Sequence, residues 1–253
     1  MRPVFWKRLL SYFTDIQVES VSSDWNPHLQ VLLSRGRYQL CTSGAIYSYE
    51  DLYANFYLTF AVLHSGYNAV FPKGPGREAG RMYLRQGRLF EEPFTSVLAG
   101  RKSVLLLGLG LGSVPWMLER HFGLNFHYTA VEVDEAVVYL AQKYALGELK
   151  SPMEIVCADA LAFVEQDHHG YDLVVMDVFR DAVIPAAFQT SSFLEYLRSR
   201  LSPNGVLLFN FLARTTEDRR QADRFFREKF LRVFPLGNYL DTGGNWVLMN
   251  GLD

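Results

Sequence analysis

The sequence predicts an α/β protein whose main body is a Rossmann-like, doubly wound, mostly parallel seven-stranded sheet, preceded by a small N-terminal β-domain. Strand-type and helix-type segments alternate from Ser103 onward, which is typical of a parallel sheet with helices on both faces. An apolar run over residues 104–107 stops at Gly108, and glycine returns at Gly110 and Gly112. This pattern indicates a strand buried on both faces that ends in a sharp turn. Before residue 50, short alternating segments indicate antiparallel strands.

Length and composition limit the function classes. The chain has 253 residues, 49% of them hydrophobic, which is enough for a large core. We expect an N-terminal β-hairpin domain over residues 1–50 and a Rossmann-like domain over 51–253, with an insert at 65–102. The net charge of −2 argues against a nucleic-acid partner. Cys41 and Cys157 lie far apart without metal-ligand spacing, so we expect reduced, buried thiols, no metal and a cytoplasmic location.

The N-terminal segments precede the main sheet. Residues 1–14 mix basic and apolar side chains and predict an amphipathic helix packed on the body, with a peripheral membrane contact as the alternative. No run is long enough to span a bilayer. Residues 15–21 alternate as a strand does, and residues 28–34 and 37–42 form a hairpin signal around Arg35-Gly36. Residues 51–64 predict a helix, and residues 82–90 within the insert predict another hairpin.

The main sheet follows. We place its strands near residues 103–107, 127–133, 153–157, 171–176, 205–211, 231–235 and 245–249. We place its helices near residues 113–122, 135–145, 160–166, 191–200 and 217–230. The last two strands follow the last helix directly, which predicts an antiparallel hairpin at one edge of the sheet.

The glycine turn is the first candidate for ligand binding. Glycine has no Cβ, so the chain can turn sharply and bring bare backbone close to a ligand. A dinucleotide motif would place its third glycine at position 113, where Ser113 stands, and this disfavours an oxidoreductase. Ser113 and Pro115 suit the first turn of a helix. The spacing of Gly108, Gly110 and Gly112 resembles that of class I S-adenosylmethionine-dependent transferases, with a tight turn that binds no ligand as the alternative.

Two carboxylates follow the next two strands. Glu132 lies about twenty residues beyond the glycines, where a carboxylate can accept hydrogen bonds from both ribose hydroxyls. Asp159 ends the following strand, and the resemblance implies that it accepts a hydrogen bond from the adenine amino group. Asp159 also suits a helix N-cap, which is the competing interpretation. We expect the neighbouring Val133 and Ala160 to contact the same nucleoside.

A second resemblance concerns the acceptor side of the site. Residues 36–40 and 49–52, with Pro185 and the helix from Ser191, resemble spermidine synthases of the class I methyltransferase fold, and residues 201–207 resemble the helix-to-strand turn of class I methyltransferases. The resemblance implies that Gln39 and Pro185 line the nucleoside site and that Tyr49 contacts an amine acceptor. It also implies that Asp177, at the end of its strand, helps to deprotonate the attacking amine.

The chain departs from that family in the insert at 65–102, at Ala45 and Ile46, where the family has an acidic pair, and at two further places that bear on the reaction. The family's two aspartates at this strand end are three residues apart, whereas Asp177 and Asp181 are four apart. Spermidine synthases carry an aspartate inside the glycine loop that holds the amino group of the aminopropyl donor, and Leu111 stands there instead. We therefore keep Asp181 as a candidate acceptor contact and expect methyl transfer rather than aminopropyl transfer.

These observations predict a transferase that uses S-adenosylmethionine, or its decarboxylated form, and acts on a small acceptor that contains an amine. An aminopropyltransferase of polyamine biosynthesis is the runner-up, and a nucleoside-binding module without catalysis is the alternative from another class. We expect neither a nucleic-acid partner nor a membrane span, and a homodimer is left open.

Overall fold

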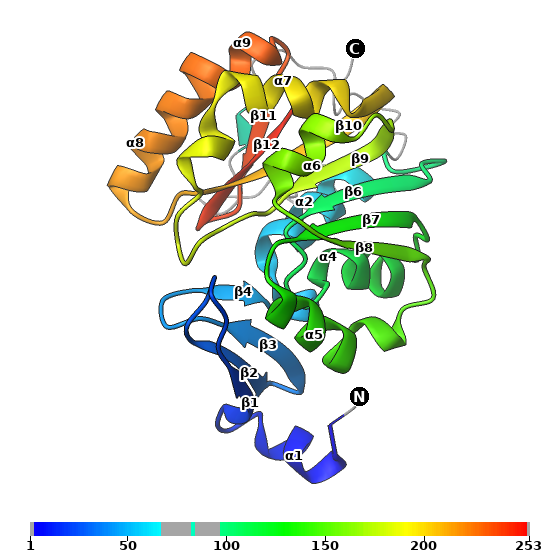
Figure 1. Ribbon diagram of the computed structural model, residues 1–253, viewed down its shortest axis with the longest axis vertical. Helices are drawn as coiled ribbons and strands as arrows, with labels where there is room; N and C mark the ends of the chain where they lie inside the picture. Colours follow the sequence, from blue (N-terminus) through cyan, green and yellow to red (C-terminus); the bar gives the residue numbers. More distant parts are fainter. Residues whose placement is uncertain (1–2, 67–81, 84–96, 252–253) are drawn as a thin grey trace, which may run out of the picture.

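The computed structural model describes residues 3–66, 82–83 and 97–251. Among these residues it contains a four-stranded sheet near the N-terminus and a larger eight-stranded sheet. Figure 1 shows the smaller sheet, in blue, below the larger one, with helices on both faces of the larger sheet. The division into domains over residues 1–50 and 51–253 remains a prediction, although the smaller sheet ends at Ser48.

The smaller sheet is an antiparallel meander of four strands in chain order. Its strands are β1 (Ile16–Val21), β2 (Leu29–Ser34), β3 (Arg37–Cys41) and β4 (Ile46–Ser48). The predicted hairpin joins β2 to β3, with Ser34 opposite Arg37. Its two turn residues, Arg35 and Gly36, have φ values of 48° and 75°. Positive φ at both central residues matches the right-handed twist of the flanking strands.

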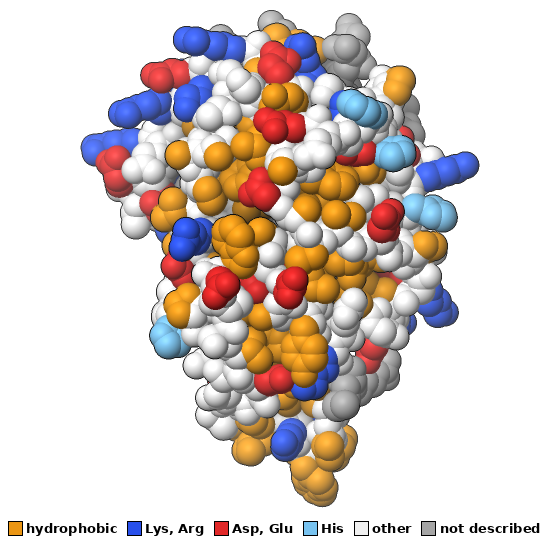
Figure 2. Space-filling model, in the orientation of Figure 1, with side chains coloured by type: hydrophobic (Ala, Val, Ile, Leu, Met, Phe, Trp, Pro, Cys, Tyr) orange, Lys and Arg blue, Asp and Glu red, His pale blue; other side chains and the backbone are white. Residues whose placement is uncertain are grey.

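Helix α1 (Phe5–Leu10) corrects one expectation. The helix forms, but none of its residues is buried. The side chains of Trp6 and, beyond the helix, Phe13 are 73% and 86% exposed. The segment is held from its end instead, because the Arg35 N–H donates to the carbonyl oxygen of Ser11. The predicted packing of an apolar face on the body is therefore wrong, and Figure 2 shows orange and blue side chains at this lower end of the molecule.

The larger sheet confirms the predicted alternation. Its order is β5-β11-β12-β10-β9-β6-β7-β8, with parallel pairing from β10 to β8 and antiparallel pairing around β12. Its strands are β5 (Met82–Tyr83), β6 (Ser103–Leu107), β7 (His127–Glu132), β8 (Met153–Cys157), β9 (Tyr171–Met176), β10 (Leu201–Leu212), β11 (Asn238–Asp241) and β12 (Asn245–Met249). The two-residue strand β5 adds to the predicted seven. The remainder of the predicted hairpin at 82–90, and most of the insert at 65–102, lie outside the described residues.

Helices cover both faces of this sheet. The longer segments are α2 (Ala54–Ser65), α4 (Ser113–Trp116) continued by the π-helix η2 (Met117–His121), α5 (Glu135–Tyr144), α6 (Ala160–Gln166), α7 (Ser191–Ser199) and α8 (Thr216–Phe225) continued by the π-helix η5 (Phe226–Phe230). The short segments are η1 (Glu50–Leu52), η3 (Leu146–Glu148), η4 (Ala186–Gln189) and α9 (Leu231–Val233).

The buried side chains of β6 show how the core is divided. Val104 and Leu106 pack into one cluster, on the side of α2, α4 and α5. Leu105 and Leu107 pack into a second cluster, on the side of α6, α7 and α8. Successive side chains of a strand point to opposite faces, so a strand in the middle of this sheet is apolar at every position.

One predicted strand is wrong. Residues 231–233 are helical, and the strand expected at 231–235 is β11 at Asn238–Asp241. Phe226, Phe230 and Val233 are buried at helical spacing, so they continue the helix against the sheet. Pro235, which lacks an N–H, then ends it. The antiparallel pairing of β11 with β12 agrees with the prediction.

The cysteines also differ in part from expectation. Cys41 is partly buried, and burial raises the pKa of its thiol to about 11. Cys157, at the end of β8, is exposed. It was predicted to be buried, but strand β8 lies at the edge of the sheet and has a neighbour on one side only.

Candidate functional site

A pocket of about 560 Å³ lies at the carboxyl ends of the parallel strands. Strand β6 pairs with β7 on one side and with β9 on the other, so the chain order of the sheet switches at β6. Open α/β sheets bind ligands at such a switch point. The predicted residues that line the pocket are Tyr49, Gly108, Gly110, Glu132, Val133, Asp159, Ala160, Asp177, Asp181 and Pro185. Figure 2 shows red and orange side chains near the middle of the face in view.

The glycine turn packs against two other parts of the site. Gly108, with φ of 89°, lies so close to Asp177 that a Cβ would overlap the carbonyl oxygen of that residue. A Cβ on Gly110 would lie 3.0 Å from Cβ of Ser48 in strand β4. The first two glycines therefore allow the loop to pass between β9 and the smaller sheet. Gly112, with φ of 81°, precedes helix α4 and does not line the pocket.

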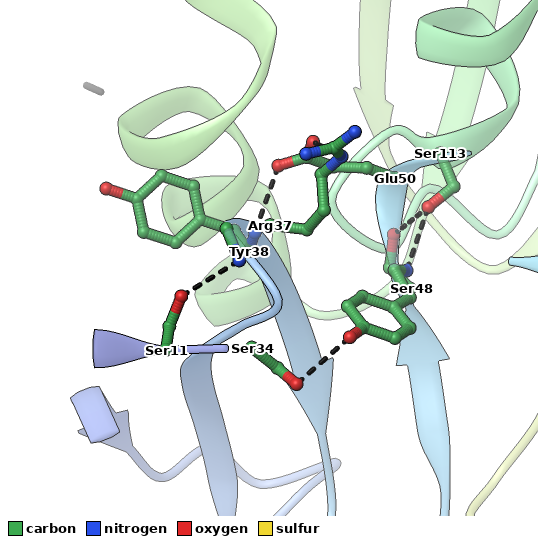
Figure 3. A network of polar contacts seen from close by, with 9 residues as sticks. Ser11, Ser34, Arg37, Tyr38, Ser48, Glu50 and Ser113 are labelled. Carbon is green, nitrogen blue, oxygen red and sulfur yellow. Dashed lines mark hydrogen bonds and ion pairs between the residues drawn. The ribbon is translucent and has the colours of Figure 1, made fainter. Parts of the chain in front are cut away.

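Ser113 connects the glycine loop to the smaller sheet. Its Oγ lies 2.6 Å from Oγ of Ser48 and accepts a hydrogen bond of 3.0 Å from the backbone N–H of Tyr49. Figure 3 shows these contacts beside the turn that leads into Glu50. Helix α4 begins at Ser113, as the sequence predicts, but the serine side chain makes no helix cap. Ser113, which stands where a dinucleotide-binding motif would have its third glycine, thus holds strand β4 against the glycine loop.

Glu132 bridges the glycine loop and the start of helix α5. Its Oε2 accepts a hydrogen bond of 3.0 Å from the Leu109 N–H, and its Oε1 accepts one of 3.1 Å from the Asp134 N–H. Burial raises the pKa of Glu132, and these backbone donors oppose that rise. The carboxylate is held rigidly at the pocket wall, where hydroxyl groups of a ligand could donate to it.

Asp159 is the N-cap of helix α6. Its Oδ1 accepts a hydrogen bond of 3.0 Å from the Ala162 N–H, as the competing interpretation of the sequence required. The residue is exposed and lines the pocket. A contact between Asp159 and adenine therefore stays a prediction, and capping uses one of the two carboxylate oxygens.

The smaller sheet supplies the opposite wall. Tyr47 donates a hydrogen bond of 2.9 Å to Oδ1 of Asn26 and accepts one of 2.8 Å from the Asp181 N–H. Nδ2 of Asn26 in turn donates to Oδ2 of the buried Asp134 at 2.7 Å. The chain of contacts from Asp134 through Asn26 and Tyr47 to Asp181 ties both sheets together across the pocket.

Asp177 follows β9 and receives two hydrogen bonds on one oxygen. Nδ2 of Asn210 lies 2.8 Å from its Oδ1, and the hydroxyl of Tyr53 lies 3.3 Å from the same atom. Burial raises the pKa of Asp177 to about 7, although both donors favour the ionised form. A carboxyl group with such a pKa can accept and release a proton at neutral pH.

Two predicted residues do not reach the pocket with their functional groups. Gln39 is buried in the smaller sheet and is absent from the pocket wall. Tyr49 lines the pocket, but its hydroxyl donates to Oγ of Ser34 at 3.0 Å, away from Asp177. Tyr53, four residues later, is the tyrosine that contacts Asp177.

Sequence reasoning missed the residues that surround Asp177. Tyr53, Asn55, Arg214 and Asn245 line the pocket, and Asn210 binds Asp177 from strand β10. Asn210 is a polar residue inside an apolar strand and is 1% exposed. A polar residue within an apolar strand was the one local signal for this part of the site, because a buried amide needs hydrogen-bond partners.

Comparisons with known proteins identify two groups of relatives. No family model matches the chain. The chain is 25% identical over 138 residues to a probable polyamine aminopropyl transferase of Bifidobacterium longum, covering 54% of this chain and 30% of the relative. It is 30% identical over 123 residues to the bovine (Bos taurus) eEF1A lysine and N-terminal methyltransferase, covering 44% of this chain and 18% of the relative. The chain thus spans less than a third of the length of either.

Solved structures show the same pair of groups. Spermidine synthase from Thermotoga maritima matches with a TM-score of 0.60 at 17% identity, covering 94% of this chain and 74% of that one. This chain has the class I S-adenosylmethionine-dependent transferase fold. Human methyltransferase-like protein 13, in complex with SAH, shares this fold with a TM-score of 0.51 at 28% identity, covering 62% of this chain and 74% of that one.

Membrane-spanning helices and clusters of metal ligands are absent from the described residues. No helix among them is long and apolar enough to cross a membrane. Within the same ranges, no group of three or more His, Cys, Asp or Glu side chains could hold a metal ion.

Proposed function

We propose that this protein transfers the methyl group of S-adenosylmethionine to an amine of a small acceptor. The observation that carries the proposal is Asp177, a carboxyl group at the switch point of the sheet whose pKa lies at about 7. The relatives of both groups are named as enzymes that transfer a group to an amine, an aminopropyl transferase in one case and a lysine and N-terminal methyltransferase in the other. These names support group transfer to an amine as the reaction of this protein.

The pocket fits a nucleoside. Gly108 and Gly110 present backbone without side chains at one end, and Glu132 offers carboxylate oxygens beside them. Val133, Ala160 and Pro185 supply apolar surface for a base, and Asp159 lies at the same wall. The volume of about 560 Å³ is in the usual range for such ligands. We assign these residues to the cofactor, whereas Gln39 and Gly112 do not line the pocket and would act on it only indirectly.

The chemistry needs an amine without its extra proton. Bound S-adenosylmethionine would supply a methyl carbon activated by a sulfonium. An alkyl amine is mostly protonated at pH 7, so a neighbouring base must take a proton before the nitrogen lone pair can attack. Asp177 is that base in our proposal, and both of its hydrogen bonds end on Oδ1, which leaves Oδ2 for the amine proton. Asp181 and Tyr49 also line the pocket and are secondary candidates for acceptor contacts, Tyr49 through atoms other than its hydroxyl, which donates to Ser34.

Leu111 favours methyl transfer over aminopropyl transfer. Its side chain is 1% exposed in the apolar core and does not line the pocket. The glycine loop therefore offers no carboxylate at this position for a donor amino group. Aminopropyl transfer remains the second candidate, because spermidine synthases match over 94% of the chain.

The test combines donors with one substitution. S-adenosylmethionine and, separately, decarboxylated S-adenosylmethionine are offered with a panel of amines, and products are identified by mass spectrometry. Asp177→Asn should keep SAH affinity within a few-fold and lower turnover at least about a hundredfold. Asp181→Asn should have a smaller effect. Spermidine formation from putrescine would favour the second candidate, and SAH binding without turnover of any amine would favour a binding module.

We further propose a cytoplasmic protein that acts on a small molecule rather than on nucleic acid. The net charge of −2 supports the second point. A homodimer would cover the apolar side chains that α1 exposes, and sedimentation analysis would test it.

A further inference from the structure

The wall of the pocket around Asp177 carries an unusual charge balance for a site that binds amines. It is formed by residues 53–55 at the start of α2, by Leu212 at the end of β10 with Arg214 beyond it, and by Thr242, Gly244 and Asn245 before and at the start of β12. Arg214 is the one cation that these described segments contribute, and none of them contributes a carboxyl group besides Asp177, whereas Arg180 and Asp181 line the pocket from the loop after Asp177.

Arg214 is available to a ligand. The residue is exposed, lines the pocket and makes no ion pair with any residue in the described ranges. Arg214 lines the same pocket as Tyr53 and Asp177, and its positive charge opposes the rise that burial and Asp177 cause in the pKa of Tyr53. Tyr53 in turn donates to Asp177. Arg214 therefore lies near the place where the reacting amine would sit.

The other acidic residues that line the pocket, Glu132, Asp159 and Asp181, belong to other segments of its wall. Asp241 pairs with Arg219 at 2.5 Å and does not line the pocket. Asp181 also lines the pocket, and its backbone N–H donates to the Tyr47 hydroxyl on the side of the smaller sheet. Glu132 supports the glycine loop. A second ammonium group on the acceptor would thus find Arg214, Leu212 and neutral amides beside Asp177.

We propose that the acceptor carries an anionic group, most simply a carboxylate, which Arg214 binds while the amine of the same molecule lies at Asp177. This deepens the proposed function and rests on it. A guanidinium binds carboxylates through paired hydrogen bonds, and it repels the second ammonium of a diamine. Selectivity for amino acids over diamines then comes from attraction and repulsion together.

The experiment compares pairs of amines of equal length. γ-Aminobutyrate is compared with putrescine, δ-aminovalerate with cadaverine, and β-alanine with diaminopropane, each titrated by calorimetry into the protein with and without SAH. In at least one pair the amino acid should bind about tenfold more tightly, since attraction and repulsion at an exposed charge each contribute about threefold. Arg214→Gln should reduce this ratio to about twofold or less, and Arg214→Glu should reverse it. Arg180→Gln, at another exposed arginine of the pocket, is the matched control and should leave the ratio unchanged.

Three results would overturn the proposal. These are tighter binding of the diamines, a ratio that Arg214→Gln does not change, and no binding of any amino acid up to about 10 mM. Binding of SAH is measured in the same titrations. If the wild-type protein does not bind SAH, the proposed function is contradicted. If it binds SAH but prefers diamines to amino acids, only this inference is contradicted.

Discussion

Nδ2 of Asn210 donates a hydrogen bond of 2.8 Å to Oδ1 of Asp177, and this contact fixes the carboxyl group in the pocket. The amide itself is oriented by Asn245, whose Nδ2 donates to Oδ1 of Asn210 at 2.8 Å. Both asparagines are buried. The pair therefore holds one oxygen of Asp177 in place and leaves the other for an acceptor amine.

Removing this donor should raise the pKa of Asp177 further. The Asn210 amide lowers the pKa of Asp177 against the effect of burial, so Asn210→Ala should move it above about 7. The rising limb of the pH–rate profile should then shift to higher pH, and SAH affinity should change little. Asn245→Ala, which only frees the amide to rotate, should cause a smaller shift in the same direction. An unchanged profile in Asn210→Ala would show that the amide does not tune Asp177.

The stability of the protein should depend on the same group. The folded-state pKa of Asp177 is raised from an ordinary value of 3.8 to about 7. Between these values the folded state binds more protons than the unfolded state, so the contribution of Asp177 to stability is fully present below pH 3.8 and is lost as the pH rises to about 7. Urea unfolding across this range should show a shallower decline for Asp177→Asn than for the wild type. If the free energy of unfolding changed with pH equally in both proteins, the raised pKa of Asp177 would be contradicted.

Glu132 should be required for cofactor binding. Its carboxylate lines the pocket and holds the Leu109 N–H of the glycine loop. Glu132→Ala should weaken SAH binding about 5- to 150-fold, equivalent to about 1–3 kcal/mol, because both the loop and the ligand lose a charged acceptor. Calorimetry measures the change. Glu135→Ala, at an exposed residue outside the pocket wall, is the control and should bind SAH as the wild type does.

Gly108 should not tolerate a side chain. Its Cβ would overlap the Asp177 carbonyl oxygen, and its φ of 89° disfavours other residues. Gly108→Ala should lower the free energy of unfolding by at least about 2 kcal/mol. Gly147→Ala is the matched control, because nothing lies within 4 Å of a Cβ there. Equal stability of the two variants in urea would show that the close approach at Gly108 is relieved without cost.

Ser113 should contribute more to stability than Ser48, although the two hydroxyls contact each other. Ser113 Oγ also accepts the Tyr49 N–H, so Ser113→Ala leaves a backbone donor and a hydroxyl without their partner. Its cost should be about 1–3 kcal/mol, and Ser48→Ala should cost less. Hydrogen exchange at Tyr49 should speed up in Ser113→Ala and remain slow in Ser48→Ala. Equal exchange in the two variants would contradict the connecting role of Ser113.

Several features of the site could be predicted from the sequence because they depend on local order. Gly108, Glu132, Asp159 and Asp177 each lie at or just after the end of a strand that its apolar pattern reveals. Carboxyl ends of neighbouring parallel strands lie at the same edge, so these residues had to meet there. The prediction of a strand near 231–235 was wrong because this segment lacks a clear local pattern. Short apolar runs have no period of their own, and only packing of Phe230 and Val233 on the sheet made them helical.

By itself, the sequence determined the fold class, the glycine turn and the acidic residues at the strand ends, since these follow from periodicity and from the backbone freedom of glycine. Only the tertiary structure decided which tyrosine reaches Asp177, that Gln39 lies away from the pocket wall, and that Asn210 and Arg214 surround the candidate base. These residues come from separate elements, α2, the smaller sheet and the end of β10. Their encounter depends on long-range packing, which no local pattern encodes.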